Sequence, residues 1–246
     1  MKVAIIGGGL VGRVASWAVM QAGACPVIYD RMEHAITPRG FVYIHDPIDL
    51  PLTPSAVDVA CQGNEIEYAQ KVYGAGTEAS VVSFGKFSGK QLCYDPAQLL
   101  GMLNGLQHGM RVDRNFEDLD EILALREEGF EKIIFTLPLN RFVKGNFPSI
   151  RGSVGTWPLN EGEVLNNWCV YNSSPDIPWY RSGAMYGYAF REFPKVIAGH
   201  QPIVKVLDGD SPPEIPGVLF TGRFGRWSKR ALSHDTYYET LKWLSS

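Results

Sequence analysis

Three glycines near the N-terminus have the spacing of a phosphate-binding turn. Gly7, Gly9 and Gly12 form a G-x-G-x-x-G pattern directly after the apolar run 2–6, which is typical of a buried parallel strand. In such a unit the first glycine allows a sharp turn, the second lets a pyrophosphate approach the backbone, and the third lets the following helix pack on the strand. The helix N-terminus, with Leu10 and Val11, then presents free N–H groups to the phosphates.

Asp30 follows the second apolar run, residues 26–29, and has the charge needed to bind a sugar. Residues 13–21 carry apolar side chains at helical spacing, and Gly23 is suited to end that helix. An acid at the end of the second strand, roughly 20 residues past the glycines, accepts hydrogen bonds from ribose hydroxyls. This combination favours a dinucleotide site over a glycine-rich turn in another kind of α/β protein.

The composition describes an ordinary globular protein. The 246 residues are 45% hydrophobic and 20% charged, with a net charge of −3, which gives no global attraction to nucleic acid or to an anionic membrane. No segment approaches the roughly 18 consecutive apolar residues of a membrane helix, and the N-terminal run lacks the features of a signal peptide. The four cysteines have no metal-ligand spacing. We therefore expect a cytoplasmic protein with reduced thiols and no metal.

The remaining pattern predicts the elements that must position these groups. Helices are expected over residues 65–73, from Asp95-Pro96 onward, over 118–128 and over 235–244. Strands are expected over 79–87 and 90–94, joined as a hairpin, and over 132–136. Residues 32–76 read as an irregular excursion from the nucleotide sheet, in which His34 and His45 read as surface residues rather than catalysts. Residues 163–172 and 184–193 are expected to pair as aromatic-rich strands.

The sequence after Asp30 resembles that of FAD-dependent amine oxidases. Asp30-Arg31, followed by the glycine-containing loop 37–41, matches their acid-plus-basic signature and the loop that touches the flavin. The resemblance implies that Arg31, Arg39 and Gly40 help to bind FAD. NAD-dependent dehydrogenases share the first half of this pattern, so the first forty residues leave a nicotinamide cofactor open.

The C-terminal residues 216–227 resemble the last flavin-binding segment of the UDP-galactopyranose mutase and amine oxidase superfamily. A strand there ends in Gly222-Arg223 and precedes the helix expected over 235–244, whose N-terminus the resemblance directs at the flavin N1–O2 edge. A helix dipole at that edge would stabilise the negative charge of a reduced flavin. The resemblance places Gly222, Arg223 and Trp227 at the cofactor. It also places Thr136 there, at the return to the nucleotide sheet, and favours FAD over NAD(P).

Together these resemblances imply an α/β fold, a Rossmann-like FAD-binding domain (GR2-type) with a small inserted β-rich substrate domain. The predicted boundaries assign residues 1–76, 96–141 and 205–246 to the FAD-binding domain. Residues 77–95 and 142–204 are assigned to the substrate-binding region. Typical members are considerably longer, so this chain would be a shortened member with a more open site.

Residues 177–181, Ile-Pro-Trp-Tyr-Arg, resemble a mutase segment in which the arginine reaches the substrate diphosphate. The resemblance implies that Arg181 binds an anionic substrate group, for which guanidinium donors are suited. An arginine stacked on neighbouring rings for structure is the alternative. The residues after Arg181 depart from the mutase pattern, which argues against mutase activity. Tyr180, Arg181 and His234 are the candidate catalytic residues, with Tyr186 a further candidate.

Aromatic and basic residues gather in the C-terminal part of the chain. The aromatic side chains between residues 157 and 188 either fill a core or wall a cavity against the flavin face. A basic cluster surrounds Trp227 and comprises Arg223, Arg226, Lys229 and Arg230. It forms either a solvated turn or a surface for a polyanion such as DNA, with a base stacked on Trp227.

These observations lead to three functional hypotheses. The first is a FAD-dependent oxidoreductase of the amine oxidase type, which oxidises a C–N bond of a small-molecule or DNA-borne amine. Compact proteins of this sort resemble bacteriophage FAD-dependent lyases that trim amino-acyl-modified thymine in DNA. The second is a non-catalytic flavin-binding sensor or subunit, and the third is an NAD(P)-dependent reductase. The oligomeric state is not predicted.

Overall fold

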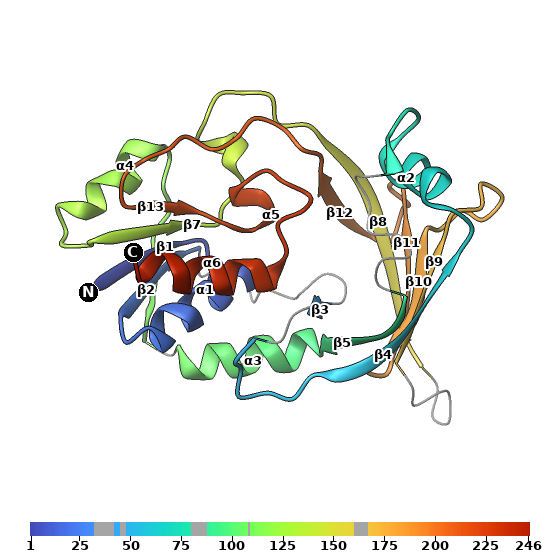
Figure 1. Cartoon of the computed structure of the whole chain (residues 1–246), viewed down its shortest axis with the longest axis horizontal. Coiled ribbons are helices and arrows are strands. Elements are labelled where there is room, and N and C mark those ends of the chain that lie inside the picture. Colours follow the sequence, from blue (N-terminus) through green and yellow to red (C-terminus); the bar gives the residue numbers. More distant parts are fainter. Residues whose placement is uncertain (32–41, 45–47, 80–87, 108, 160–166) are drawn as a thin grey trace.

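The computed structural model describes residues 1–31, 42–44, 48–79, 88–107, 109–159 and 167–246. They form two sheets that lie on opposite sides of the molecule in Figure 1. The first sheet contains five parallel strands in the order β13-β7-β1-β2-β6. Its strands are β1 (Lys2–Ile6), β2 (Cys25–Asp30), β6 (Arg111–Asp113), β7 (Lys132–Phe135) and β13 (Val218–Phe220).

Helices cover both faces of the first sheet. On one face, α1 (Leu10–Gln21) and α6 (Ser233–Leu244) bury a cluster that includes Val3 and Ile5. On the other face, α4 (Leu119–Leu123) and the turn 124–126 cover Ala4 and Ile6. Strands that are covered on both sides read as continuous apolar runs, and this explains the sequence of β1.

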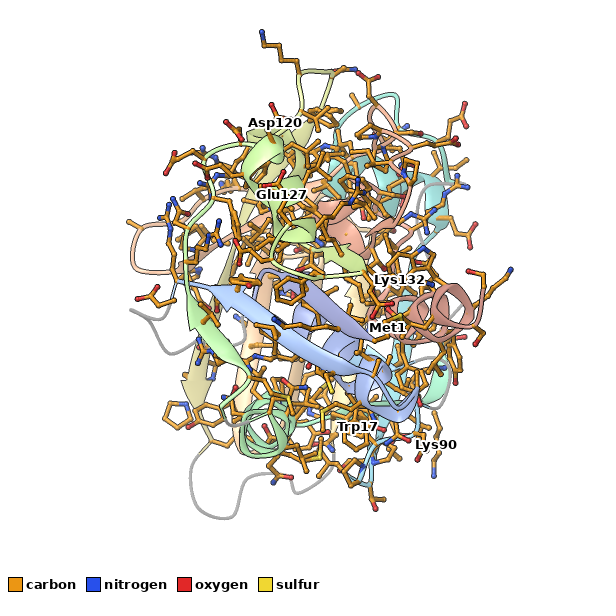
Figure 2. The ribbon with its side chains drawn as sticks, turned by 90° about the vertical axis from the view of Figure 1, so that its left-hand side faces the viewer. Met1, Trp17, Lys90, Asp120, Glu127 and Lys132 are labelled. Atoms are coloured by element: carbon orange, nitrogen blue, oxygen red, sulfur yellow. The ribbon has the colours of Figure 1, made fainter. Side chains whose placement is uncertain are left out.

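A third helix, α3 (Pro96–Leu106), packs against the outer side of α1. Asp95 begins α3, since its Oδ1 accepts a hydrogen bond from the backbone N–H of Ala97 at 2.8 Å. Leu99 and Leu103 of this helix contact Trp17 of α1 in one apolar cluster. Figure 2 shows Trp17 on this side of the first sheet, with Asp120 and Glu127 on the opposite side.

The second sheet contains eight strands in the order β12-β8-β11-β10-β9-β4-β5-β3. They are β3 (Val42–Ile44), β4 (Ser55–Gln62), β5 (Gly89–Tyr94), β8 (Ser149–Pro158), β9 (Trp168–Asn172), β10 (Arg181–Met185), β11 (Tyr188–Phe193) and β12 (Gln201–Val206). Neighbouring strands of this sheet run antiparallel, except that β4 and β9 run parallel to each other. Helix α2 (Glu65–Tyr73) packs on this sheet through Tyr68, against Tyr171 and Tyr180.

Most of the predicted elements are confirmed. The helix over 65–73 has the predicted bounds, and the strands at 2–6, 25–30 and 132–135 and the C-terminal helix lie where the patterns placed them. The predicted 118–128 helix is shorter, because α4 ends at Leu123 and continues as a 3₁₀ turn. The segment 79–87, expected as half of a hairpin, lies mostly outside the described residues.

Two predictions about the second sheet are wrong. In the described part of the 163–172 segment, β9 meets the predicted 184–193 strand only at Trp168 and Ala184, because β10 lies between β9 and β11 and pairs with both. The 32–76 segment is not simply irregular, because β4 is an eight-residue strand with Val57 and Val59 buried. Strands β3 and β4 belong to the second sheet, although the predicted boundaries assign them to the FAD-binding domain. The division into domains is untested and stays a prediction.

Candidate cofactor and substrate site

The glycine turn between β1 and α1 needs two of its glycines for its own packing. Gly7 has φ +107°, and a Cβ added there would lie 2.6 Å from Thr136 Oγ1. A Cβ added at Gly12 would collide with the carbonyl oxygen of Gly7. These two glycines therefore allow the turn and the close approach of α1, as the motif predicts.

Gly9, in contrast, is not required by the packing of the described protein. It has φ −64°, and a Cβ added there would meet no described atom within 4 Å. Gly9 is the N-cap of α1, where no side chain caps the helix, and the first turn carries no acidic residue. Open space beside uncapped N–H groups and a positive helix end fits a phosphate group.

Asp30 lies beside this turn, where a ribose would have to bind. Its carboxylate is so close to Gly8 that a Cβ added to Gly8 would collide with Oδ2. Arg111 of β6 approaches the same oxygen, with its Nη2 at 3.3 Å. Arg31 points elsewhere, since its Nε donates a hydrogen bond to Asn115 Oδ1 at 2.9 Å.

A buried arginine that the sequence analysis did not select donates a hydrogen bond to the glycine turn. Arg13 is 1% exposed. Its Nε donates to the Gly8 carbonyl at 3.1 Å and its Nη1 to Gln107 Oε1 at 3.3 Å. Burial, and then the charge of Arg111, lower the pKa of Arg13 to about 10, while Asp30 opposes this shift. Arg13 could have been recognised in the sequence as a charged residue between neighbours that the helix buries.

The C-terminal segment reaches the same turn from the other end of the chain. Gly222 has φ +74°, and a Cβ added there would lie 2.5 Å from Val11 Cγ1 in the first turn of α1. Gly222 begins the short helix α5 (Gly222–Gly225), which follows β13. Thr136 lies between these parts, since its hydroxyl donates to the Ile6 carbonyl at 2.9 Å. The fold thus brings Gly7, Val11, Thr136 and Gly222 together.

Trp227 does not face a ligand, and the prediction that it stacks on a flavin or a base is corrected. It is 3% exposed, and its Nε1 donates to the Pro148 carbonyl at 2.9 Å. Its ring packs edge-on against Phe147 and Phe224. The indole therefore belongs to the hydrophobic core, because nearly all of its surface is already covered.

The basic residues around Trp227 do not form one continuous free patch. Arg226 pairs with Glu239 of α6, and Lys229 Nζ lies 3.1 Å from Asp208 Oδ2. Arg230 is exposed. Arg223 is partly buried, and no described residue accepts a hydrogen bond from its Nε.

His234 lies at the N-terminus of α6, as predicted, but inside the protein. It is buried, and its Nε2 lies 3.4 Å from Asp235 Oδ1. The other carboxylate oxygen of Asp235 accepts a hydrogen bond from the backbone N–H of Leu232 at 2.7 Å. The acid three residues into the helix therefore satisfies one of its first N–H groups.

Tyr180 and Arg181 meet a buried glutamate that the sequence analysis did not select. Tyr180 is buried, and its hydroxyl donates to Glu192 Oε2 at 2.7 Å. Arg181 lies opposite Glu192 in the β10–β11 register, and its Nη2 donates to Glu192 Oε1. Lys205 of β12 completes the group, with its Nζ 3.9 Å from Glu192 Oε2. Side chains alternate between the two faces of a strand, so Glu192 lies on the same face as Phe190, and this alternation in 188–193 could have identified Glu192 as buried.

The charged residues around Glu192 shift the pKa values of their neighbours. Burial would raise the pKa of Glu192, but Arg181 and then Lys205 outweigh it, so that this pKa lies below its ordinary value. Burial raises the pKa of Tyr180 well above 10, and the neighbouring Glu192 charge adds to that shift. Tyr180 is therefore a neutral hydrogen-bond donor at neutral pH rather than a base.

The Arg181 side chain also contacts two rings, as the structural alternative predicts. Its guanidinium lies 5.9 Å from the centre of the Tyr171 ring and 5.6 Å from that of Phe190. Tyr186 also has a partner within the protein, because its hydroxyl donates a hydrogen bond to the Cys93 carbonyl at 2.9 Å. Arg39 and Gly40, like His34 and His45, lie outside the described residues.

A cavity of about 390 Å³ lies away from these groups. Apolar residues of the 48–54 segment line it, together with Leu92 and Tyr94 of β5. It contains none of the predicted site residues. Among the described residues, no cluster of metal-ligating side chains occurs and no helix is long and apolar enough to cross a membrane.

The fold is that of several solved enzymes. A reduced UDP-galactopyranose mutase superposes with a TM-score of 0.54 and 8% identity, over 99% of this chain and 93% of the mutase. A tryptophan 6-halogenase from Streptomyces toxytricini gives 0.61 and 10% identity, over 98% of this chain and 71% of the halogenase. HpxO from Klebsiella pneumoniae, complexed with FAD and uric acid, gives 0.51 and 10% identity, over 100% and 79%.

These likenesses define the class of fold. The chain is an α/β protein with a Rossmann-like parallel sheet and a second, mainly antiparallel sheet. At about one identical residue in ten, the comparisons establish the architecture alone. No family model matches the chain, and no curated protein matches its sequence.

Proposed function

We propose that this protein is a FAD-dependent oxidoreductase. The observation that carries the proposal is the turn at Gly9, an open, uncapped helix end with Asp30 on one side and Gly222 on the other. The chain's own packing does not require a glycine at position 9, whereas a pyrophosphate does. Solved proteins with this fold include one that was complexed with FAD.

The residues that would hold FAD follow from this geometry. The N–H groups at Gly9, Leu10 and Val11 would bind the pyrophosphate, and Asp30 would accept the ribose hydroxyls. Gly222 would let the backbone pass the cofactor closely. Arg31 and Thr136 act differently from the prediction in this structure, since Arg31 bonds Asn115 and Thr136 bonds the turn itself.

The finer proposal is oxidation of the amine oxidase type. FAD supplies an acceptor for two electrons, taken with a hydrogen as hydride from the carbon next to the substrate nitrogen. The resulting imine takes up water and separates into a carbonyl compound and a free amine, and an external acceptor such as dioxygen reoxidises the cofactor. The group around Glu192, which includes Lys205, would hold the substrate in one orientation.

A substrate borne on DNA, as for a lyase acting on amino-acyl thymine, is the narrower form of this proposal. Arg223, Arg226, Lys229 and Arg230 would supply the backbone contacts, although two of them are in ion pairs and Trp227 is buried. Titration with duplex DNA at about 50 mM salt tests it, because phosphate contacts are strongest there. Absence of binding under these conditions would remove the DNA form and leave the small-molecule form intact.

A single glycine substitution tests the cofactor proposal. We expect Gly9→Ala to leave the thermal unfolding midpoint within about 2 °C and to abolish copurifying FAD, because the added methyl group meets no described protein atom but blocks a pyrophosphate. The visible spectrum and the FAD released by heating report the cofactor. Gly105→Ala on the exposed side of α3, which also meets no atom, is the matched control and should retain FAD.

A wild-type protein that neither copurifies with FAD nor takes it up would contradict the proposal. A protein that binds FAD but whose flavin is not bleached anaerobically by any amine would instead support the non-catalytic alternative. A protein without flavin that gains NADPH fluorescence would support the nicotinamide-dependent reductase.

A further inference from the structure

Two cations, Arg181 and Lys205, pair with the Glu192 carboxylate on one face of the second sheet, and a third cation, Arg223, acts on Lys205. Arg181 and Glu192 are paired in register, and Lys205 projects from the same face two strands further along. Arg223 belongs to α5 on the nucleotide side, and its charge contributes to the lowered pKa of Lys205 and opposes the rise that burial causes in the pKa of Tyr73. Among the described residues, Glu192 is the acid that opposes the lowering of the Lys205 pKa.

Glu192 is already occupied by other partners. Its Oε1 accepts from Arg181 and its Oε2 accepts from the Tyr180 hydroxyl. Lys205 is left at 3.9 Å from Oε2, with its Nζ 4.3 Å from the centre of the Tyr180 ring. Arg181 thus neutralises Glu192, and Lys205 is held less closely by the same carboxylate.

Neither Lys205 nor Arg223 has all its donors satisfied by the described protein, although Lys205 has its ion pair with Glu192. No described residue accepts a hydrogen bond from the buried Nε of Arg223, and no described acid lies within 4.0 Å of its guanidinium. The Lys205 side chain is 20% exposed and has no hydrogen-bond acceptor among the described residues. Glu192 has one negative charge against the two positive charges of Arg181 and Lys205, and excess charge in a mostly buried place is unfavourable, so a balanced structural ion pair does not explain the group.

We propose that Lys205 and Arg223 form a subsite for an anionic group, a carboxylate or a phosphate, of the substrate. The proposal rests on the proposed function, since it names the substrate class for the same site. Arg181, Glu192 and Tyr180 are positioning residues, because Arg181 and Tyr180 hold the Glu192 carboxylate that pairs with the Lys205 ammonium. Tyr73 and Tyr171 place ring surface beside the group.

The subsite has a proton linkage that a rigid ion pair would lack. Burial, opposed by Glu192 and reinforced by Arg181 and Arg223, lowers the pKa of Lys205 to about 8. The other charged groups nearby, Lys229 and Asp208, pair with each other. An anion would favour the charged lysine, so binding near pH 8 should take up a proton and weaken at higher pH.

Calorimetric titration of the full-length protein with inorganic phosphate and with benzoate tests the proposal. For the probe that matches the substrate group, we expect binding at pH 7 that weakens at least tenfold at pH 9.5. Lys205→Met should weaken binding at pH 7 at least tenfold, whereas Lys144→Met, at an exposed position, should not change it. Lys205→Arg should bind at both pH values, because an arginine keeps its charge.

Two results would overturn the proposal. One is that neither probe binds the wild type, and the other is that Lys205→Met, shown to be folded by circular dichroism, binds as well as the wild type. If Lys205→Met does not fold, Lys205→Arg decides, since a pH dependence identical to that of the wild type would also overturn it. Released FAD is measured separately, so a protein that binds anions at Lys205 without FAD would sustain the subsite and refute the cofactor proposal.

Discussion

Burial of the charged Lys205 side chain lowers the free energy of unfolding at neutral pH. Its pKa is lowered from 10.5 to about 8, so between these pH values the unfolded chain holds more protons than the folded one. The free energy of unfolding therefore rises with pH across that window, and the cost is fully present below pH 8. A charge kept at such a cost is expected where binding, and not packing, selects the residue.

Replacing the charge should therefore stabilise the protein at neutral pH. We expect Lys205→Met to raise the thermal unfolding midpoint at pH 7 by a few degrees and to lose this advantage by about pH 10.5. Lys144→Met, at an exposed site, should change neither value. Unfolding scans at pH 7 and 10.5 check this, and a lower midpoint for Lys205→Met at pH 7 would mean that the contact with Glu192 stabilises more than burial costs.

At the scale of the elements, the cofactor turn depends on close backbone contacts that only glycine allows. Gly222 is in the left-handed region and lies against Val11, and Gly225 packs on the end of β7, where a Cβ would lie 2.6 Å from the Phe135 carbonyl. Gly222 sets how close α5 comes to α1, and Gly225 sets how close it comes to β7.

Gly222→Ala should consequently cost more stability than Gly9→Ala. The added methyl group both strains the backbone and contacts Val11, so we expect a loss of roughly 2–4 kcal/mol in the free energy of unfolding. Urea denaturation of the cofactor-free proteins measures it. Gly222→Ala together with Val11→Ala should recover part of the loss, and no recovery would show that backbone strain alone is responsible.

The same elements show what the sequence could reveal. Four strands of the first sheet were predictable because they are short apolar runs next to glycine, capping and acid signals that act locally, whereas β6, with the sequence Arg-Val-Asp, was not predicted. Strand β8 was missed because it contains Gly152 and Gly155, which lower strand propensity. The neighbouring strand β11 requires a glycine at position 152, since a Cβ there would collide with the Phe193 carbonyl. Lys205 was missed because it stands out only once β12 is placed beside β8.

For the molecule as a whole, the proposed cofactor would join parts that are far apart in the chain. Figure 1 shows both termini at the first sheet and α5 between that sheet and β12. The turn at Gly9, Asp30 of β2 and Gly222 of α5 would all contact one ligand, which the unfolded chain cannot do. A ligand that binds only the folded state stabilises the entire chain by mass action.

FAD should therefore raise the unfolding midpoint of the whole protein, and by a predictable amount. At a free FAD concentration about 1,000 times Kd, the stabilisation is about 4 kcal/mol, or roughly 8–16 °C for a chain of this size. Scanning calorimetry of the cofactor-free protein at increasing FAD concentrations measures the shift. Gly9→Ala should unfold at the midpoint of the cofactor-free wild type and show no FAD-dependent shift, whereas Gly105→Ala should follow the wild type. A midpoint that does not respond to FAD in the wild type would show that the open space beside Gly9 serves another ligand.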